Sequence, residues 1–203
     1  ASMGAKVLPD QTVLFCGKPV KKEEEMILLA FHKPTGIVCT AEKREKNNVV
    51  DYINYPKRIY PIGRLDKDSE GLILLTNDGD LINAMMRGAN RHEKEYIVKT
   101  DREITPDFLE KMAKGIYLKD LDITTRECEI EQIGKFTLRI VLTQGVNRQI
   151  RRMCEACGYR VKALKRIRIM NILLGDLKPG KWREVTGEEL EQLQRDTGML
   201  NRN

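Results

Sequence analysis

The sequence predicts an α+β fold, and three observations support this class. Short apolar runs and alternating segments, both typical of strands, recur along the 203 residues. Between them stand N-cap residues, a first-turn proline and closing glycines, which mark helices. With 41% hydrophobic residues, the chain can bury one substantial core or two small sub-lobes that share a cleft. Because strands dominate and helices lie between them, we expect an α+β domain.

The first elements are a small hairpin and a buried strand. Residues 13–20 are expected to form the hairpin, and residues 21–25 a charged linker before the main body. Residues 26–31 form a short apolar run, and Lys33-Pro34-Thr35-Gly36 then supplies a turn. This pattern predicts a buried strand, and residues 37–40 are expected to pair with it or continue it.

A second apolar run leads into a helix. Residues 72–76 are almost entirely apolar and end at Asn77-Asp78-Gly79, whose side chains and glycine favour a tight turn. Either Asp78 or Asp80 can cap a helix that continues through Met86. The pattern therefore predicts strand, turn and helix in that order.

The next segments repeat the alternation of strand and helix. Residues 95–100 read as a strand, and Thr105 followed by Pro106 predicts the start of a helix that ends at Gly115. Residues 136–142 alternate between apolar and polar side chains, so they predict a half-buried strand that leads to Gly145.

Two further helices are expected near the end of the chain. Residues 147–156 read as a helix, with Gly158 just beyond its end. Thr186 and Glu189 match a capping box for a closing helix that includes Leu190 and Leu193.

Basic residues are concentrated in one segment. The chain carries 36 Lys and Arg against 30 Asp and Glu, a net charge of +6. From Arg148 to Arg168 there are eight basic residues and a single acid, Glu155. This distribution favours contact with phosphates, because interleaved apolar residues would hold the cations on packed elements. The alternative is a solvated basic face.

The composition also bears on location and on thiol chemistry. No apolar run reaches the roughly 20 residues of a membrane span, and the polar start lacks the apolar core of a secretory signal, so a cytoplasmic protein is expected. Five scattered cysteines favour reduced thiols. Cys154 and Cys157 form a Cys-x-x-Cys pair without a second pair or a nearby His, so a metal or redox site is the less favoured alternative.

A charged loop precedes the apolar strand at residues 72–76. Its sequence runs Gly63-Arg64-Leu65-Asp66-Lys67-Asp68-Ser69-Glu70-Gly71. A rigid strand can hold such a loop in place, as a catalytic group requires. Arg64 and Asp66 are also compatible with a surface ion pair worth less than ~1 kcal/mol, and spacing alone does not decide between the two.

This segment resembles the catalytic motif of pseudouridine synthases, in the branch that contains the RsuA, RluB, RluE and RluF enzymes. Four further blocks are similar and occur in the family's order, and within the branch the segments at residues 93–96 and 168–171 are most similar to the RluF enzymes, which modify 23S ribosomal RNA. The four blocks are Lys33-Pro34-Thr35-Gly36, His92-Glu93-Lys94-Glu95-Tyr96, the segment from Gly145-Val146-Asn147-Arg148 to Met153, and Arg166-Ile167-Arg168-Ile169-Met170-Asn171. The resemblance covers residues 26–193 and implies the family's catalytic fold, a mixed and largely antiparallel sheet in two sub-lobes with a central cleft, flanked by helices.

The resemblance implies catalytic roles for three residues. Asp66 matches the essential aspartate, which acts as a nucleophile at C1′ or as a base at C2′, and both routes stay open. Tyr96 matches the tyrosine that stacks on the flipped base and assists removal of the C5 proton. Arg151 matches the basic residue that pairs with the aspartate. Without the resemblance, Tyr96 would read as a core aromatic and Arg151 as a phosphate contact.

Further residues are expected to bind the substrate. Ile150 matches the apolar residue that packs on the target base, whereas the remaining candidates would contact RNA. These RNA contacts are Arg64, Arg148, Arg152, Lys165 and Arg168. No cofactor and no metal are expected, because two histidines and no acidic cluster offer a poor ligand set.

The start of the chain departs from the family pattern. Enzymes of this branch begin with a helical S4 RNA-binding domain, and residues 1–25 resemble only the end of such a domain, truncated, plus a linker. Residues 26–203 are then the catalytic domain. We expect a monomer that acts on structured RNA, 23S ribosomal RNA in particular. The alternative is an RNA-binding or ribosome-assembly protein of the same fold with idle or secondary catalysis.

Overall fold

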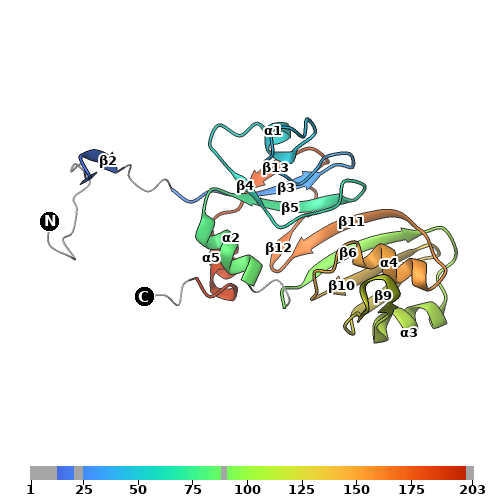
Figure 1. The fold of residues 1–203 in the computed structure, drawn as a ribbon. Coiled ribbons are helices and arrows are strands. Elements are labelled where there is room, and N and C mark those ends of the chain that lie inside the picture. The colour runs from blue at the N-terminus through green and yellow to red at the C-terminus, as the bar shows by residue number, and fades with distance from the viewer. Residues whose placement is uncertain (1–12, 21–24, 88–90, 200–203) are drawn as a thin grey trace.

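A computed structural model describes residues 13–20, 25–87 and 91–199. Its main feature is one mixed sheet that runs through two lobes (Figure 1). The strands follow the order β13 (Trp182–Glu184), β3 (Leu28–Lys33), β5 (Glu70–Thr76), β11 (Val161–Ile169), β6 (Lys94–Thr100), β10 (Thr137–Leu142) and β9 (Glu129–Gly134). All neighbours along this path are antiparallel except β5 and β11, which are parallel. The predicted α+β class, with a largely antiparallel sheet in two lobes, is confirmed.

The first lobe is built around β3 and β5, which are buried on both faces. One face packs against α2 (Gly79–Arg87) and α5 (Gly187–Asp196), and the other packs against α1 (Val49–Ile53). The short strand β4 (Tyr60–Ile62) pairs with β5. Covering both faces explains why these two strands read as continuous apolar runs rather than as alternating segments.

The second lobe has one apolar face and one charged face. β6, β10 and β11 pack their apolar side chains against α3 (Pro106–Lys114) and α4 (Gln149–Ala156). Two strand pairs complete this description, β7 (Tyr117–Leu118) with β8 (Ile123–Thr124) and β12 (Ile172–Leu173) with β11. A 3-10 turn, η1 (Lys119–Leu121), lies between β7 and β8. The half-buried pattern predicted for residues 136–142 is therefore confirmed.

The lobes meet where β5 pairs with β11. Gly71 lies opposite Arg166 in this parallel pair and has a φ of +115°. A Cβ at this position would stand 2.2 Å from the Arg166 carbonyl oxygen, so only glycine allows the two backbones to approach this closely. β11 then continues from the core of the second lobe, at Leu164, into that of the first, at Ile169.

Most of the predicted caps and turns are present. The Asp78 side chain accepts hydrogen bonds from the amides of Asp80 (2.8 Å) and Leu81 (3.3 Å) at the start of α2. Thr105 Oγ1 accepts from the Phe108 amide, and α3 ends at Gly115 as predicted. The hairpin of residues 13–20 is confirmed as β1 (Val13–Phe15) and β2 (Lys18–Val20). The linker at 21–25 lies almost entirely outside the described residues.

Two local predictions are wrong. Residues 37–40 do not form a strand; Val38 makes only an isolated bridge with Asn48. The capping box of α5 does not form either, because Thr186 makes no side-chain cap hydrogen bond while the Glu189 carboxylate accepts from Arg183. The helix that was expected from residue 147 begins at Gln149.

Among the described helices, none is long and apolar enough to cross a membrane.

Candidate active site

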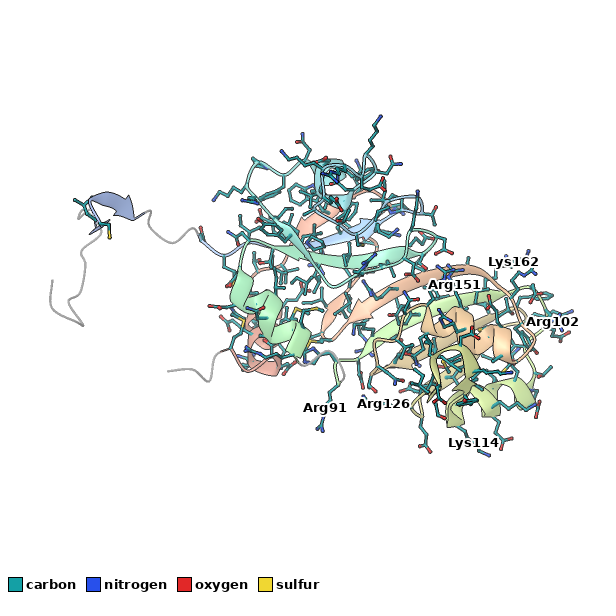
Figure 2. All side chains as sticks on the ribbon, viewed as in Figure 1. Arg91, Arg102, Lys114, Arg126, Arg151 and Lys162 are labelled. Atoms are coloured by element: carbon teal, nitrogen blue, oxygen red, sulfur yellow. The ribbon has the colours of Figure 1, made fainter. Side chains whose placement is uncertain are left out.

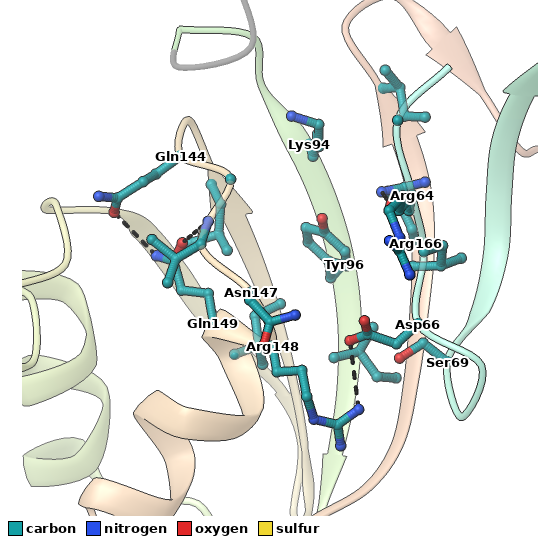
Figure 3. Close-up of a pocket in the computed structure, with 18 of the residues that line it drawn as sticks. Arg64, Asp66, Ser69, Lys94, Tyr96, Gln144, Asn147, Arg148, Gln149 and Arg166 are labelled. Carbon is teal, nitrogen blue, oxygen red and sulfur yellow. Dashed lines mark hydrogen bonds and ion pairs between the residues drawn. The ribbon is translucent and has the colours of Figure 1, made fainter. Parts of the chain in front are cut away.

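A cleft of about 460 Å³ lies where the two lobes meet (Figure 3). Its walls come from segments far apart in the sequence. They are the loop between β4 and β5, strand β6, the loop from β10 into α4, and strand β11. Asp66, Tyr96, Ile150 and Arg151, which the resemblance identified as site residues, all line this cleft, as do Arg64 and Arg148.

The loop that carries Asp66 is held from three directions. The Ser69 amide donates to the Asp66 carbonyl (3.0 Å), which closes a turn within the loop. From the first lobe, the Gly36 amide donates to the Lys67 carbonyl (2.7 Å). From β11, Arg166 donates to the Arg64 carbonyl (3.3 Å). The position of the Asp66 backbone is thus fixed, while its side chain stays one-third exposed to the cleft.

Lys33, at the end of β3, also supports this loop and is fully buried. Its ammonium donates to three carbonyl oxygens, those of Pro34 (2.8 Å), Ile37 (2.9 Å) and Lys67 (3.4 Å). Burial lowers the pKa of Lys33, and nearby Cys39 and Asp66 oppose that effect. The Lys33-Pro34-Thr35-Gly36 block therefore supports the loop of Asp66 rather than lining the cleft.

Arg148 faces Asp66 across the cleft. Its guanidinium makes two hydrogen bonds of 2.9 Å to the carboxylate of Asp68 and lies 3.7 Å from Asp66 Oδ2. The hydrogen bond from Arg148 is the main reason that the pKa of Asp68 is lowered. Arg148 has a left-handed backbone, with φ +53°, immediately before α4. This conformation directs the side chain back over the loop of Asp66.

The predicted pairing of Arg151 with Asp66 is wrong in this structure. One Arg151 nitrogen donates to the Asp68 carbonyl and to Ser69 Oγ, both at 3.1 Å, and its Nε lies 3.6 Å from the Asp68 carboxylate. α4 begins only at Gln149, so Arg148 extends across the cleft while Arg151 lies one turn further along against the end of the loop. Arg148 is the basic residue at ion-pair distance from Asp66.

Tyr96 and Ile150 supply apolar surface beside Asp66. Tyr96 projects from β6 into the cleft and is partly buried (Figure 3). Ile150, in the first turn of α4, is 4% exposed and belongs to the core of the second lobe. A flat aromatic ring and a branched aliphatic side chain that face one cleft suit a planar base.

The other predicted RNA contacts are dispersed. Arg152 bonds the Asn147 carbonyl and Asp120, and Arg168 binds Glu95 (2.7 Å) and Glu93 (3.0 Å). Neither residue lines the cleft, nor does Lys165. Basic side chains are instead spread over the second lobe, where Arg102, Lys114 and Lys162 point outward (Figure 2).

The cleft also contains residues to which the sequence had assigned no role. Lys94, Asn147, Gln149 and Arg166 all line it. The signal for Lys94 was its position two residues before Tyr96, which places both side chains on one face of a strand. Within the described residues, no group of three or more His, Cys, Asp or Glu side chains could hold a metal ion. The Cys-x-x-Cys pair lies on and just after α4 as free thiols, one of them buried.

Comparisons with known proteins agree on one family. A family model described as RNA pseudouridylate synthase matches residues 27–156. The dual-specificity RNA pseudouridine synthase RluF of Escherichia coli K12 is 47% identical over 195 residues, which cover 95% of this chain and 67% of the relative. The ribosomal large subunit pseudouridine synthase B of Bacillus subtilis is 34% identical over 197 residues, covering 94% of this chain and 80% of the relative. A crystal structure of a pseudouridylate synthase superposes with a TM-score of 0.77 at 26% identity, covering 95% of this chain and 84% of that chain.

Proposed function

The chain belongs to the RNA pseudouridine synthase family, whose enzymes isomerise uridine to pseudouridine, and we propose that its substrate is 23S ribosomal RNA and that Asp66 is the catalytic carboxylate. The choice of RNA is supported by the ribosomal large subunit synthase of Bacillus subtilis among its relatives. A ribosomal RNA substrate also supports a cytoplasmic location for the enzyme.

One observation carries the assignment of the catalytic residues. Asp66, Tyr96 and Ile150 come from three separate parts of the sequence and line the same cleft. A carboxylate beside an aromatic ring and an apolar wall is the environment that cleavage of a nucleoside requires. The base can stack, the sugar can face the carboxylate, and water can be kept out.

The chemistry of the isomerisation needs little more than one carboxylate. The bond between N1 and C1′ breaks, the uracil turns over, and C5 bonds to C1′. The C5 proton is then removed, and N1 takes up a proton, so no atom is gained or lost overall. Asp66 can attack C1′ directly or remove a proton from C2′. Both routes place its carboxylate beside the ribose.

The neighbours of Asp66 have separable roles in this proposal. Tyr96 stacks on the base and assists removal of the C5 proton, and Ile150 packs on the base. Arg148 holds a positive charge beside the Asp66 carboxylate, at 3.7 Å. Arg151 acts as a positioning residue through Ser69 and the Asp68 carbonyl. Arg64, exposed at the rim, contacts the RNA.

The test is release of tritium from 23S ribosomal RNA that carries 5-³H-uridine. We expect release by the native chain and none by Asp66→Asn, because C5 loses its hydrogen only when the carbon–carbon glycosidic bond forms. RNA binding by Asp66→Asn should stay within about tenfold, since the carboxylate contributes chemistry rather than phosphate contact. Asp107→Asn is the matched control, because Asp107 is exposed on α3, outside the cleft, and pairs with Lys111.

The outcomes separate the two functions considered. Equal release by the native chain and by Asp66→Asn would rule out the catalytic assignment. Tight binding without any release by the native chain would favour an RNA-binding or assembly protein of the same fold. A loss of RNA binding in Asp66→Asn as large as its loss of turnover would also count against the assignment.

We also propose the division into residues 1–25 and 26–203. The family model begins at residue 27, and the hairpin of β1 and β2 is the segment that resembles the last strands of an S4 RNA-binding domain. Residues 26–203 then form the catalytic domain, which we propose acts as a monomer.

A further inference from the structure

One end of the cleft carries positive charge that no carboxylate balances. Arg64, Lys94 and Arg166 all line the cleft, and in the described part of the chain none of them forms an ion pair with an acid. Asp66 is the acidic residue among the lining side chains, and Arg148 stands beside it. The three cations therefore face the cleft without an ion-pair partner among the described residues.

Lys94 is placed to meet a ligand that lies on Tyr96. Both residues belong to β6 and are two positions apart, so their side chains leave the same face of the strand, about 6.6 Å from each other along it. Figure 3 shows both side chains on the cleft side of β6, with Tyr96 nearer Asp66 and Lys94 further along the strand. Glu95, between them, lies on the opposite face, where it binds Arg168 and Arg139.

Arg166 adds to the positive charge at this end of the cleft. It is 3% exposed, and its guanidinium donates to the carbonyls of Leu72 (2.7 Å) and Arg64 (3.3 Å). Carbonyl oxygens satisfy its hydrogen bonds but leave its positive charge in place. The pKa of Lys94 is lowered by burial first and by Arg166 second, and no protein acceptor for its ammonium is present among the described residues. An anion beside Lys94 would favour its charged form and so oppose the lowering of its pKa by burial and by Arg166.

We propose that Lys94 binds a backbone phosphate of the RNA adjacent to the target uridine, at the end of the cleft away from Asp66. The inference rests on the proposed function, because it takes the ligand to be RNA whose target base lies on Tyr96. A phosphodiester carries one negative charge, and its position next to the ribose puts it within a short distance of the stacked base. A lysine ammonium, a compact charge with three donors, is suited to such an oxygen.

The test compares Lys94→Gln with Lys99→Gln. Lys99 lies on the same strand and is exposed, its side chain leaves the opposite face, and the loss of charge is identical. For Lys94→Gln we expect Kd and KM for the RNA to rise about tenfold with kcat within about twofold of the native value. The slope of log Kd against log salt should fall by about 0.7, one single-strand phosphate. Lys99→Gln and Lys94→Arg should both stay near the native values, and thermal unfolding checks that each variant is folded.

A chemical variant of the RNA identifies the partner of Lys94. Once the modified uridine has been mapped in the RNA, a methylphosphonate at one of the two phosphates that flank it removes a single charge. We expect one of these replacements to weaken binding by the native chain and by Lys94→Arg, and to have no further effect on Lys94→Gln. If both replacements weaken native binding and Lys94→Gln binding to the same extent, Lys94 does not contact a flanking phosphate.

The remaining outcomes separate this inference from the proposed function. A Lys94→Gln variant that loses kcat with an unchanged salt slope would overturn the phosphate contact and indicate a role in the chemistry. Equal effects of Lys94→Gln and Lys99→Gln would overturn it as well. If the native chain binds RNA with the Lys94-dependent slope but releases no tritium, the phosphate contact stands and the catalytic function fails.

Discussion

Glu95 and Tyr96 are neighbours in sequence but act on opposite faces of β6. Tyr96 faces the cleft, whereas Glu95 is nearly buried on the other face between Arg168 and Arg139. Burial alone would raise the pKa of Glu95, but hydrogen bonds from these two arginines outweigh it and leave the pKa below its ordinary value. The charge of Glu95 thus ties β6 to β11 and to β10.

We expect Glu95→Gln to lower the free energy of unfolding by about 2 kcal/mol at pH 7, because two arginines lose their shared carboxylate. The pKa of Glu95 is lower in the folded state, so its contribution is complete above the ordinary value of 4.5 and is lost as the pH falls through the folded value. The difference between native chain and variant should therefore shrink between pH 5 and pH 3. Urea unfolding at several pH values measures it.

Glu110→Gln is the control for this experiment. Glu110 pairs with Lys114 on an exposed face of α3, where such a pair contributes under about 0.5 kcal/mol. A difference between the native chain and Glu95→Gln that stayed constant from pH 7 to pH 3 would contradict the assignment of the stabilising charge to Glu95.

At the level of single residues, the sequence located the site better than it located the contacts within it. Asp66, Tyr96, Ile150 and Arg151 all line the cleft, as expected from the resemblance. The partner of Asp66 was not predictable, because the left-handed backbone of Arg148 has no sequence marker of the kind that glycine provides. The basic run from Arg148 to Arg168 also misled, since the register shift between Arg166 and Arg168 sends Arg168 to the face away from the cleft.

The contact between β5 and β11 depends on a single glycine. The Arg166 backbone lies so close to Gly71 that a methyl group would overlap it, and the φ of +115° is unfavourable for any other residue. Cleft residues on both lobes depend on this contact, because Arg166 also holds the Arg64 carbonyl beside Asp66.

We expect Gly71→Ala to lower the free energy of unfolding by at least about 3 kcal/mol, since strain at a positive φ adds to the backbone overlap. Turnover should fall in the molecules that remain folded. Gly79→Ala is the control, because a Cβ there meets nothing within 4 Å and Gly79 is not among the glycines with a positive φ. Similar urea midpoints for the two variants would show that the close approach is not essential.

Among the elements, the helices that begin at a side-chain N-cap were predictable from the sequence, and strand β11 was not. Asp78 and Thr105 cap α2 and α3 as expected, because an N-cap needs only a side-chain oxygen next to free amides. β11 carries irregularities between Val161 and Ala163 and between Arg166 and Arg168, which interrupt the period of two by which strands are recognised. Its many basic residues then read as a binding surface.

One continuous sheet joins the cores of the two lobes through β5 and β11. Trp182, the single tryptophan, reports on the first lobe through its edge contact with Tyr55, at 5.3 Å between ring centroids. Cys154 reports on the second, since it is fully buried and burial raises the pKa of its thiol to about 12. The two probes are thus independent reporters of two cores joined by β5 and β11.

We expect Trp182 fluorescence and pulsed alkylation of Cys154 at pH 8 to give the same urea midpoint, because neither core can lose β11 without disturbing the other. Mass spectrometry of the Cys154 peptide separates its labelling from that of the more exposed thiols. Alkylation of Cys154 at urea concentrations where Trp182 fluorescence is still native would show instead that the second lobe unfolds by itself.

The hydrogen bond from Arg166 to the Arg64 carbonyl also bears on the stage of synthesis at which this enzyme can become active. The two residues are 102 positions apart, and β13, which covers the edge of β3, follows Arg166 along the chain. At usual rates of translation, the ribosome needs roughly 5 to 20 s to add a further 100 residues after the loop of Asp66 has been made. A nascent chain that has not yet reached Arg166 therefore holds Asp66 on a loop that Gly36 and Lys33 contact but that lacks its hydrogen bond to β11, and we expect turnover to begin only after β11 has been made.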